Sequence, residues 1–138
     1  MMGEVRTEVT LVNLGDQNDA DRGYIPQDQV RRLTVNAVVD TGAWTLVINE
    51  ATREKLGLRM EEITETTVAG GGKVSSQITE PVRIYWKDRR TTCETAVLPG
   101  ESEVLLGAYP LEGLDLMVHP KTQEVTGAHG DKVWNVVK

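Results

Sequence analysis

The apolar residues of this chain come in short runs that turn-forming residues interrupt, and this arrangement constrains the fold more than any other feature of the sequence. Within residues 4–12 one face collects Val5, Thr7, Val9 and Leu11, which is the two-residue period of a strand with one buried side. Phe is absent and the only aromatics are 3 Trp and 3 Tyr, so the core has to be aliphatic, which favours strands. Further strands are predicted over residues 30–39, 45–48, 61–69, 73–79, 81–86, 91–98 and 133–137, with short apolar runs at 104–106 and 114–118. The pattern predicts an all-β fold.

One helix interrupts the β pattern, over residues 49–56. The Asn49 side chain can accept a hydrogen bond from the first turn, Glu50 complements the helix dipole, and Gly57 stands where a left-handed residue ends a helix. Residues 108–112 predict one further helical turn. Residues 14–29, in contrast, are rich in Gly, Asp, Asn and Pro and predict a long polar hairpin connection without a packed element.

No metal or other cofactor is expected from the sequence. A calcium loop starting at Asp16 is disfavoured, because Ala20 and Asp21 occupy positions at which the EF-hand pattern requires a ligand and a glycine. His119 and His129 lie in turn-like segments and are interpreted as solvated histidines.

Length, charge and cysteine content limit the possible classes of protein. The 138 residues predict a single domain over residues 1–138. The 15 Lys and Arg against 21 Asp and Glu give a net charge of −6, which disfavours a nucleic-acid partner, and the basic cluster at 87–90 is interpreted as a solvated hairpin tip. No apolar run approaches the ~20 residues that cross a bilayer, so no membrane partner is expected. Cys93, the single cysteine, is expected to be a buried small apolar residue. Because it has no second cysteine with which to form a disulfide within the chain, a reducing cytoplasmic location is favoured.

Residues 37–43 carry the most informative motif, an apolar strand followed by Asp40, Thr41 and Gly42. Aspartic protease chemistry needs this local order. The strand holds the carboxylate rigidly, the hydroxyl can hydrogen-bond to a symmetry mate, and the glycine lets the backbone turn close to a partner. The alternative interpretation of Asp40 is a strand-end aspartate in a tight turn. The surrounding sequence favours a catalytic or formerly catalytic site.

Three further segments agree with this interpretation: the helix end at residues 55–58, the glycine triplet at 70–72 and the apolar-apolar-glycine run at 104–107. With them the chain resembles the retropepsin-like aspartic peptidases, most closely their small prokaryotic branch, over residues 30–118. In that family the strand ending in Asp-Thr-Gly meets the later apolar-apolar-glycine strand in a crossed loop under the active site, and a glycine-tipped hairpin forms a flap. The resemblance implies a closed β-barrel with one short helix after the active-site strand and a flap over residues 61–79.

The resemblance also implies roles for individual residues. Asp40 is expected to be the catalytic carboxylate. The residues expected to support the catalytic dyad are Thr41, Gly42, Ala43, Leu105, Leu106 and Gly107. The residues expected to contact substrate or form the flap are Trp44, Ala69, Gly70, Gly71 and Gly72. Because Ala43 has no hydroxyl to offer the dyad, we expect a pH optimum in the mildly acidic to near-neutral range.

Two positions depart from the family pattern. Retroviral members commonly pair an acidic residue just after the motif's alanine with an arginine just after the downstream glycine, whereas this chain has Trp44 and Ala108 there. Since both partners are missing together, no charge is left without its mate. In retroviral members this charged pair braces the dimer, and we interpret Trp44 and Ala108 as an apolar contact that replaces it. Trp44 is equally consistent with a substrate pocket and with packing in a dimer.

A single Asp-Thr-Gly imposes a symmetry requirement. The mechanism needs two carboxylates that share one proton around a water, and one chain supplies only one. We therefore expect a homodimeric aspartic endopeptidase acting on a peptide or protein substrate. Its terminal strands, residues 4–12 and 133–137 with Trp134 and Val136, are expected to interleave between subunits as in the family. Two alternatives stay open: a catalytically silent retropepsin-like peptide-binding or dimerisation module, and a plain β-barrel interaction domain with an accidental motif.

Overall fold

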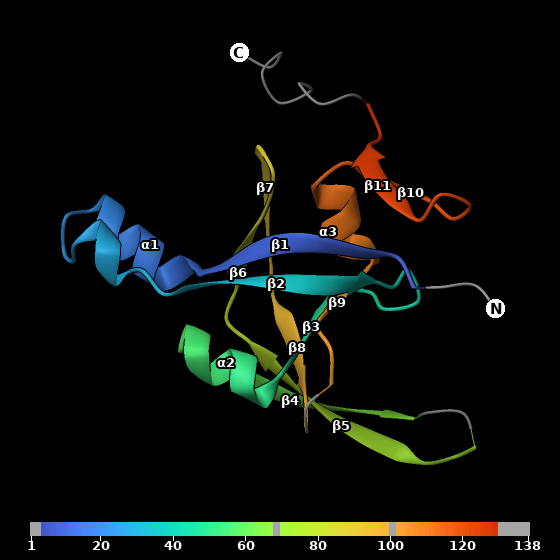
Figure 1. The fold of residues 1–138 in the computed structure, drawn as a ribbon. Helices are drawn as coiled ribbons and strands as arrows, with labels where there is room; N and C mark the ends of the chain where they lie inside the picture. Colours follow the sequence, from blue (N-terminus) through green and yellow to red (C-terminus); the bar gives the residue numbers. More distant parts are fainter. Residues whose placement is uncertain (1–3, 68–69, 100–101, 130–138) are drawn as a thin grey trace.

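The computed structural model describes residues 4–67, 70–99 and 102–129, which form a nine-stranded sheet, a separate two-stranded sheet and short helices (Figure 1). The strand order is β4-β5-β8-β3-β9-β2-β1-β6-β7 in the large sheet and β10-β11 in the small one. The strands are β1 (Arg6–Asn13), β2 (Arg32–Val39), β3 (Leu46–Asn49), β4 (Met60–Thr67), β5 (Lys73–Thr79), β6 (Val82–Trp86), β7 (Arg89–Cys93), β8 (Thr95–Leu98), β9 (Leu105–Leu106), β10 (Leu116–His119) and β11 (Glu124–Gly127). The helices are α1 (Leu14–Asp21), α2 (Glu50–Leu56) and α3 (Ala108–Gly113), with a 3₁₀ turn at Gln27–Gln29. The mostly-β architecture agrees with the sequence, while barrel closure and the single-domain organisation stay predictions.

Strand β1 lies inside the sheet. It pairs antiparallel with β2 and, from Thr10 to Asn13, with β6 on its other side. The predicted alternation is present, since Val9 and Leu11 are 1% and 0% exposed in the core. Val9 and Leu11 therefore pack in the core of the subunit itself, and the interleaving of residues 4–12 between subunits stays a prediction. The other terminal segment, residues 133–137, lies outside the described residues.

The core is aliphatic, as the composition predicts. Its fully buried members include Leu11, Leu46, Ile48, Leu106 and Leu114. Trp86 joins them at 3% exposure, and its indole N–H donates to Thr7 Oγ1 at 2.8 Å. Cys93 belongs to the same cluster, which confirms its interpretation as a small buried residue, and burial raises the pKa of its thiol.

The connection between β1 and β2 contains a packed helix, so the prediction of a polar loop without a packed element over residues 14–29 is wrong. Helix α1 begins after Asn13, whose Oδ1 accepts a hydrogen bond from Asp16 N–H at 3.0 Å. Ala20 anchors the helix in a small cluster with Val12 and Val30. The remaining helix residues are mostly polar, and no apolar stripe marks the helix in the sequence.

Helix α2 follows the sequence prediction at both ends. Asn49 Oδ1 accepts from Thr52 N–H at 2.8 Å, and Gly57 ends the helix with φ at 64°. Asn49 Nδ2 also donates to Ser102 O at 2.7 Å. One side chain therefore caps the helix and ties it to the segment that leads into β9.

Residues 91–98, predicted as one strand, form two. The chain leaves its pairing with β6 at Cys93 and, after Glu94, pairs as β8 with β3 and β5. Thr45 Oγ1 donates to Glu94 O at 2.7 Å at this break. The sequence also does not predict β11, since Val125 is the one large apolar residue among the four residues of this strand.

The cluster at residues 87–90 is only partly a solvated hairpin tip. Lys87 and Arg90 are exposed, but Arg89 is 1% exposed, so the prediction is wrong at this residue. Arg89 Nη1 donates to the backbone oxygens of Leu114 at 3.1 Å and Asp115 at 2.7 Å. The arginine thus joins β7 to the turn between α3 and β10.

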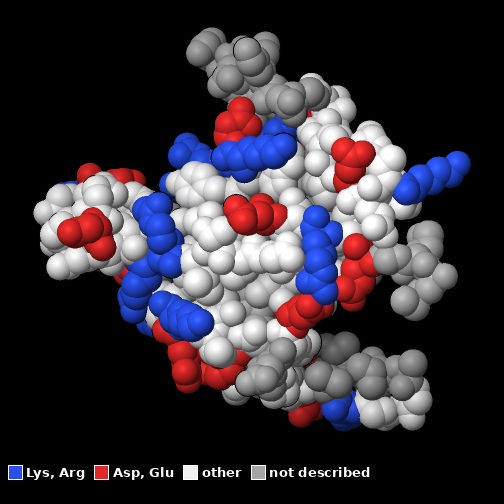
Figure 2. Space-filling model, in the orientation of Figure 1, with Lys and Arg blue, Asp and Glu red and all other residues white. Residues whose placement is uncertain are grey.

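The surface carries charges of both signs. Figure 2 shows Lys and Arg interspersed with Asp and Glu on one face of the molecule. Within the described ranges, no helix has the length and apolar character needed to cross a membrane.

Candidate active site

Asp40 lies directly after β2, where the chain leaves the sheet. Strand β9 lies between β2 and β3, parallel to the first and antiparallel to the second. The Asp-Thr-Gly turn therefore joins two strands that flank β9. Asp40 N–H donates to Leu106 O at 3.0 Å, and Val38 N–H donates to Val104 O at 2.9 Å. The backbone that carries the carboxylate is held by the same apolar run that the sequence singled out.

The turn also sets the direction of the Asp40 carboxylate. Gly42 N–H donates to Asp40 Oδ1 at 2.9 Å, and Ala43 N–H donates to the backbone oxygen of Asp40 at 3.1 Å. A Cβ at Gly42 would lie 3.1 Å from Oδ1, so a side chain there would push against the carboxylate. Asp40 is half-buried, whereas Thr41 is exposed. No described residue donates to Asp40 Oδ2, which leaves this oxygen for a partner or a water.

Gly107 lies where two backbone segments come into close contact. A Cβ at this position would lie 2.2 Å from Thr45 O and 2.6 Å from Ala43 O, both of which are backbone atoms. The next residue, Ala108, donates its N–H to Ala43 O at 2.8 Å. Glycine is required here for space rather than for a positive φ, because its φ is −85°. The start of α3 is thereby fixed against the segment that follows the motif.

The side chains of the two leucines before Gly107 pack on opposite faces of the sheet. Leu106 is fully buried in the main core, whereas Leu105 packs in a second cluster. The members of this second cluster are Ala43, Val47, Ile78, Ala96, Leu98 and Leu105, and we call it the motif-side cluster. Because Ala43 follows the Asp-Thr-Gly turn, this cluster leads from the sheet toward Asp40.

The hairpin of β4 and β5 extends beyond the rest of the sheet (Figure 1). Strand β5 pairs with β8 only near its end, where Ile78 belongs to the motif-side cluster. Gly70 and Gly71 at the tip have φ of 93° and 87°, a region that glycine adopts without strain. Gly72 follows them, and Ala69, which the sequence also assigned to a flap, lies outside the described residues. The hairpin is anchored beside the motif at its base only.

Two exposed aromatic residues lie close to the motif. Trp44 is 61% exposed and Tyr109 is 56% exposed, and Tyr109 N–H donates to Trp44 O at 2.8 Å. They line a hollow of about 360 Å³ together with Thr45, Pro81, Thr92, Cys93 and Glu94. The sequence assigned a site role to Trp44 and not to Tyr109. The one sequence feature that could have indicated Tyr109 as a site residue is its position two residues after Gly107.

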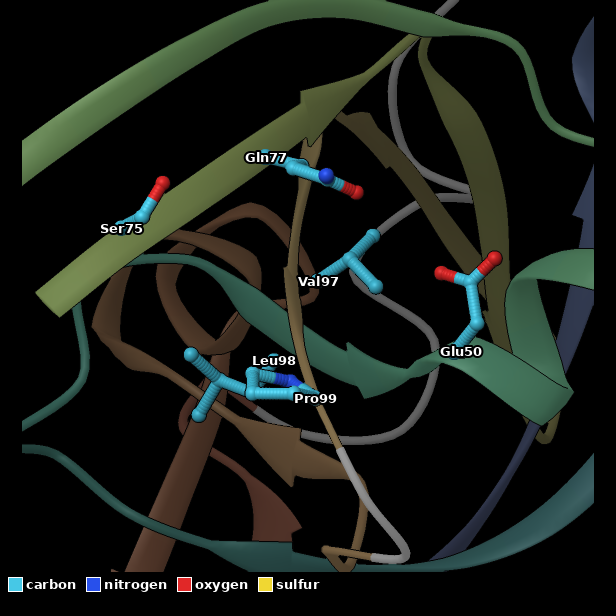
Figure 3. Close-up of a pocket in the computed structure, with 6 residues that line it drawn as sticks. All are labelled: Glu50, Ser75, Gln77, Val97, Leu98 and Pro99. Carbon is cyan, nitrogen blue, oxygen red and sulfur yellow. The ribbon is translucent and has the colours of Figure 1, made fainter.

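A larger hollow, of about 420 Å³, lies beside the pairing of β5 with β8 (Figure 3). It is lined by Glu50, Ser75, Gln77, Val97, Leu98 and Pro99. The register pairs Gln77 with Val97 and Val97 with Ile48, while Ile78, Ala96 and Val47 form the adjacent row. Since successive residues point to opposite faces, Gln77 and Val97 face away from the row of Ile78, Ala96 and Val47, and Leu98 is the one member of the motif-side cluster that lines the hollow. The size of this hollow therefore does not identify it as the place of chemistry.

Histidines and acidic residues form no metal centre within the part of the chain that the structure describes. His119 Nε2 lies 2.8 Å from Thr126 Oγ1, and His129 Nδ1 lies 2.7 Å from Asp115 Oδ1. The hydrogen bond from His129 lowers the pKa of the Asp115 carboxyl. His129 is thus exposed but paired, which the sequence interpretation did not include.

The arrangement matches a known family. The family described as "gag-polyprotein putative aspartyl protease" matches residues 28–113, which is more than half of the chain. The matched range contains the Asp-Thr-Gly turn, the glycine-tipped hairpin and the run that ends at Gly107. The chain therefore belongs to this family of retropepsin-like aspartic proteases, which confirms the resemblance found in the sequence.

Solved structures give the same assignment of the fold. The chain is similar to the retroviral protease-like domain of Ddi1 from Leishmania major, with 16% identity and a TM-score of 0.55 over 91% of this chain and 89% of that one. It is also similar to EIAV protease complexed with the inhibitor HBY-793, with 24% identity and a TM-score of 0.50 over 80% of this chain and 86% of that one. No curated protein sequence matches the chain. At these identities the similarities establish the fold alone.

Proposed function

We propose that the chain is a homodimeric aspartic endopeptidase, in which two Asp40 carboxylates, one from each subunit, activate a water for peptide hydrolysis. The observation that carries the proposal is the setting of Asp40. Its backbone is fixed by β9, its Oδ1 accepts from Gly42 N–H at 2.9 Å, and its Oδ2 has no described donor. Membership of an aspartic protease family supports the same chemistry.

The reaction follows from two carboxylates that share one proton. The ionised carboxylate takes a proton from the water as the water oxygen attacks the peptide carbonyl carbon, and the protonated carboxyl gives its proton to the carbonyl oxygen. When the tetrahedral intermediate collapses, the C–N bond breaks, the carboxyl that took the water's proton gives it to the leaving amine, and a hydroxyl of the intermediate returns a proton to the other carboxylate. Fixing each carboxylate before the reaction lowers the barrier, since reacting atoms have to be held about 3–3.5 Å apart.

An extended peptide between the β4–β5 hairpin and Asp40 suits this chemistry. In the proposal Gly70, Gly71 and Gly72 let the flap open and close, and the motif-side cluster offers an apolar wall. Trp44 lines a substrate position beyond the scissile bond. The dyad-supporting residues are those of the sequence assignment, Thr41, Gly42, Ala43, Leu105, Leu106 and Gly107. A cytoplasmic location is part of the proposal, because the single Cys93 is buried and free.

Cleavage of a peptide mixture by the wild type and by Asp40→Asn tests the proposal. Asparagine keeps an oxygen that can accept from Gly42 N–H, so the turn is preserved while the shared proton is lost. We expect cutting by the wild type and a loss of about a hundredfold or more in the variant, measured by mass spectrometry of the products. The matched control is Asp28→Asn at an exposed position, which is expected to cut like the wild type.

The other outcomes separate the alternatives. Equal cutting by Asp40→Asn would show that another protease is present in the preparation. Binding of peptides by the wild type without any cutting would favour the catalytically silent peptide-binding or dimerisation module.

A further inference from the structure

The base of the β4–β5 hairpin is closed by one residue from each side. Arg59 precedes β4 and Glu80 follows β5. Glu80 N–H donates to Arg59 O at 3.0 Å, and Arg59 N–H donates to Glu80 Oε2 at 2.8 Å. Arg59 Nε also lies 3.6 Å from Glu80 Oε1. Both strands of the hairpin therefore start from one closed pair, and we call this pair together with residues 56–58 the flap root.

Residues 56–58 of the flap root are contacted by side chains from the connection between β1 and β2. Asn13, at the end of β1, donates from Nδ2 to Leu56 O at 2.8 Å, and this hydrogen bond is buried. Arg31, just before β2, covers Gly57, since a Cβ on that glycine would lie 1.8 Å from Arg31 Nη1. Helices α1 and α2 accordingly lie at the same end of the molecule (Figure 1).

Asp16, in the first turn of α1, fixes the position of Arg31. Its Oδ2 accepts from Arg31 Nε at 2.8 Å and from Arg31 N–H at 3.0 Å, while its Oδ1 accepts from Arg31 Nη2 at 2.9 Å. Pairing at two points fixes the plane of a guanidinium as well as its place. The hydrogen bond to Asp16, with a smaller contribution from the charge of Glu80, raises the Arg31 pKa. Charges of alternating sign therefore lead from Asp16 through Arg31 and Glu80 to Arg59.

The connection that carries α1 is an addition to the conserved part of the fold, since the family match begins at residue 28. Ala20 is the one buried residue of the helix, so the helix contributes little to an apolar core. Asn13, in contrast, uses Oδ1 to cap α1 and Nδ2 to hold Leu56 O. The start of the helix and the flap root thus share one amide side chain.

We propose that the α1 connection positions the β4–β5 hairpin for substrate, with Arg31 as the positioning residue, an inference that rests on the proposed function. At about 3.3 Å per residue, the 8 residues of β4 carry the hairpin tip roughly 25 Å from its root. A small tilt at the root is therefore a larger displacement at the tip. Fixing the root in advance reduces the conformational entropy that the flap loses when it orders over a peptide.

Arg31→Gln tests the proposal, with Arg32→Gln at the adjacent exposed position as a matched control. Glutamine removes the guanidinium that pairs with Asp16 and covers Gly57. We expect KM for a cleaved peptide to rise about fivefold in Arg31→Gln, with kcat within about twofold of the wild type, and both to stay unchanged in Arg32→Gln. Arg31→Lys keeps the charge without the two-point pairing, so its KM is expected to lie between the two.

Hydrogen exchange separates a local effect on the hairpin from a general loss of stability. Amides of β4 and β5 are expected to exchange faster in Arg31→Gln than in Arg32→Gln, while those of β1 and β6 exchange as in the wild type. Equal acceleration in all four strands would overturn the proposal, because Arg31 would then act only on overall stability.

A double variant tests whether Arg31 acts through the flap. Combined with Gly71→Val at the hairpin tip, Arg31→Gln is expected to lower kcat/KM by less than the product of the two single losses, because an impaired tip gains less from a fixed root. Fully multiplicative losses would contradict the proposal.

The positioning role and the proposed function can fail separately. If Arg31→Gln has the KM and the hairpin exchange of the wild type, the positioning role is wrong, while loss of cutting in Asp40→Asn would still support the proposed catalysis. If the wild type cuts nothing but the hairpin amides exchange faster in Arg31→Gln alone, the link from α1 to the hairpin is supported and the proposed catalysis fails.

Discussion

At the scale of single residues, the site depends on glycines that let other groups come close. At Gly42 the neighbouring group is the Asp40 carboxylate, and at Gly107 it is the backbone of the segment that follows the motif. Both positions were predicted from the motif and the apolar-apolar-glycine run, because each is a short, local pattern. Tyr109 and Arg89 were not predicted, because their roles come from contacts with residues distant in the sequence.

Gly107→Ala is expected to lower the free energy of unfolding by about 1–3 kcal/mol, because a methyl group 2.2 Å from Thr45 O forces the backbone apart. Urea denaturation measures the change. The control is Gly15→Ala in α1, where the new Cβ would make an ordinary contact 3.4 Å from Asn13 Oδ1. Alanine favours a helix more than glycine does, so the control is expected to be neutral or stabilising by about 0.5–1 kcal/mol. Equal stability of Gly107→Ala and the wild type would mean that the contact relaxes without cost.

At the scale of elements, the sequence predicted those whose signals are local. Helix α2 was predicted with its cap and its terminal glycine, because Asn49 and Gly57 act within one turn of the helix ends. Helix α1 was missed, because it depends on Asn13 and Ala20 in a segment that is otherwise polar. The separation of β7 from β8 was also missed, since only tertiary pairing distinguishes one long strand from two.

Gly71→Val tests whether the tip of the β4–β5 hairpin acts as a flap. Valine at φ 87° is strained, so the tip is expected to lose the conformations that ordering over a substrate requires, with turnover falling about tenfold. The matched control is Gly23→Val, which has a similar φ of 82° and open space around it, outside the site. Both variants are expected to lose similar stability, and only Gly71→Val is expected to lose peptide cleavage. Equal cleavage by the two variants would show that the glycines form a turn and nothing more.

The Asp16–Arg31 pair makes the stability of the α1 connection dependent on pH. Arg31 Nε and Nη2 donate to the Asp16 carboxylate at 2.8 and 2.9 Å, and these hydrogen bonds lower the Asp16 pKa below its usual 3.8. Since the folded pKa lies below the unfolded value, the pair stabilises the fold above pH 3.8 and stops doing so as the pH falls through the folded pKa. Asp16→Asn is therefore expected to cost about 1 kcal/mol near pH 7 and progressively less below pH 3.8.

Urea denaturation at neutral and acidic pH measures this difference. Asp28→Asn, at an exposed position, serves as the control and is expected to change stability little at either pH. A constant difference between Asp16→Asn and the wild type at all pH values would mean that the carboxylate does not act through its charge.

At the scale of the whole molecule, the order of the sheet places β4 at one edge and β7 at the other, with the motif strands between them. The small β10–β11 sheet is joined to this architecture at β7 by the side chain of Arg89. The sequence could not predict this link, because a charged residue in a polar turn normally lies in solvent. Full burial of the guanidinium makes it a structural group rather than a surface charge.

Arg89→Met is the variant that tests this connection across the whole fold. Methionine keeps much of the buried volume but leaves the backbone oxygens of Leu114 and Asp115 without their donor, so the free energy of unfolding is expected to fall by about 2–4 kcal/mol. The matched control is Arg90→Met at the adjacent exposed position, expected to change stability by less than about 0.5 kcal/mol. Urea denaturation measures both, and hydrogen exchange is expected to show faster opening of β10 and β11 in Arg89→Met alone. If the two variants are equally stable, water replaces the guanidinium as the donor, and the hairpin is held by its apolar contacts through Leu116 and Val125.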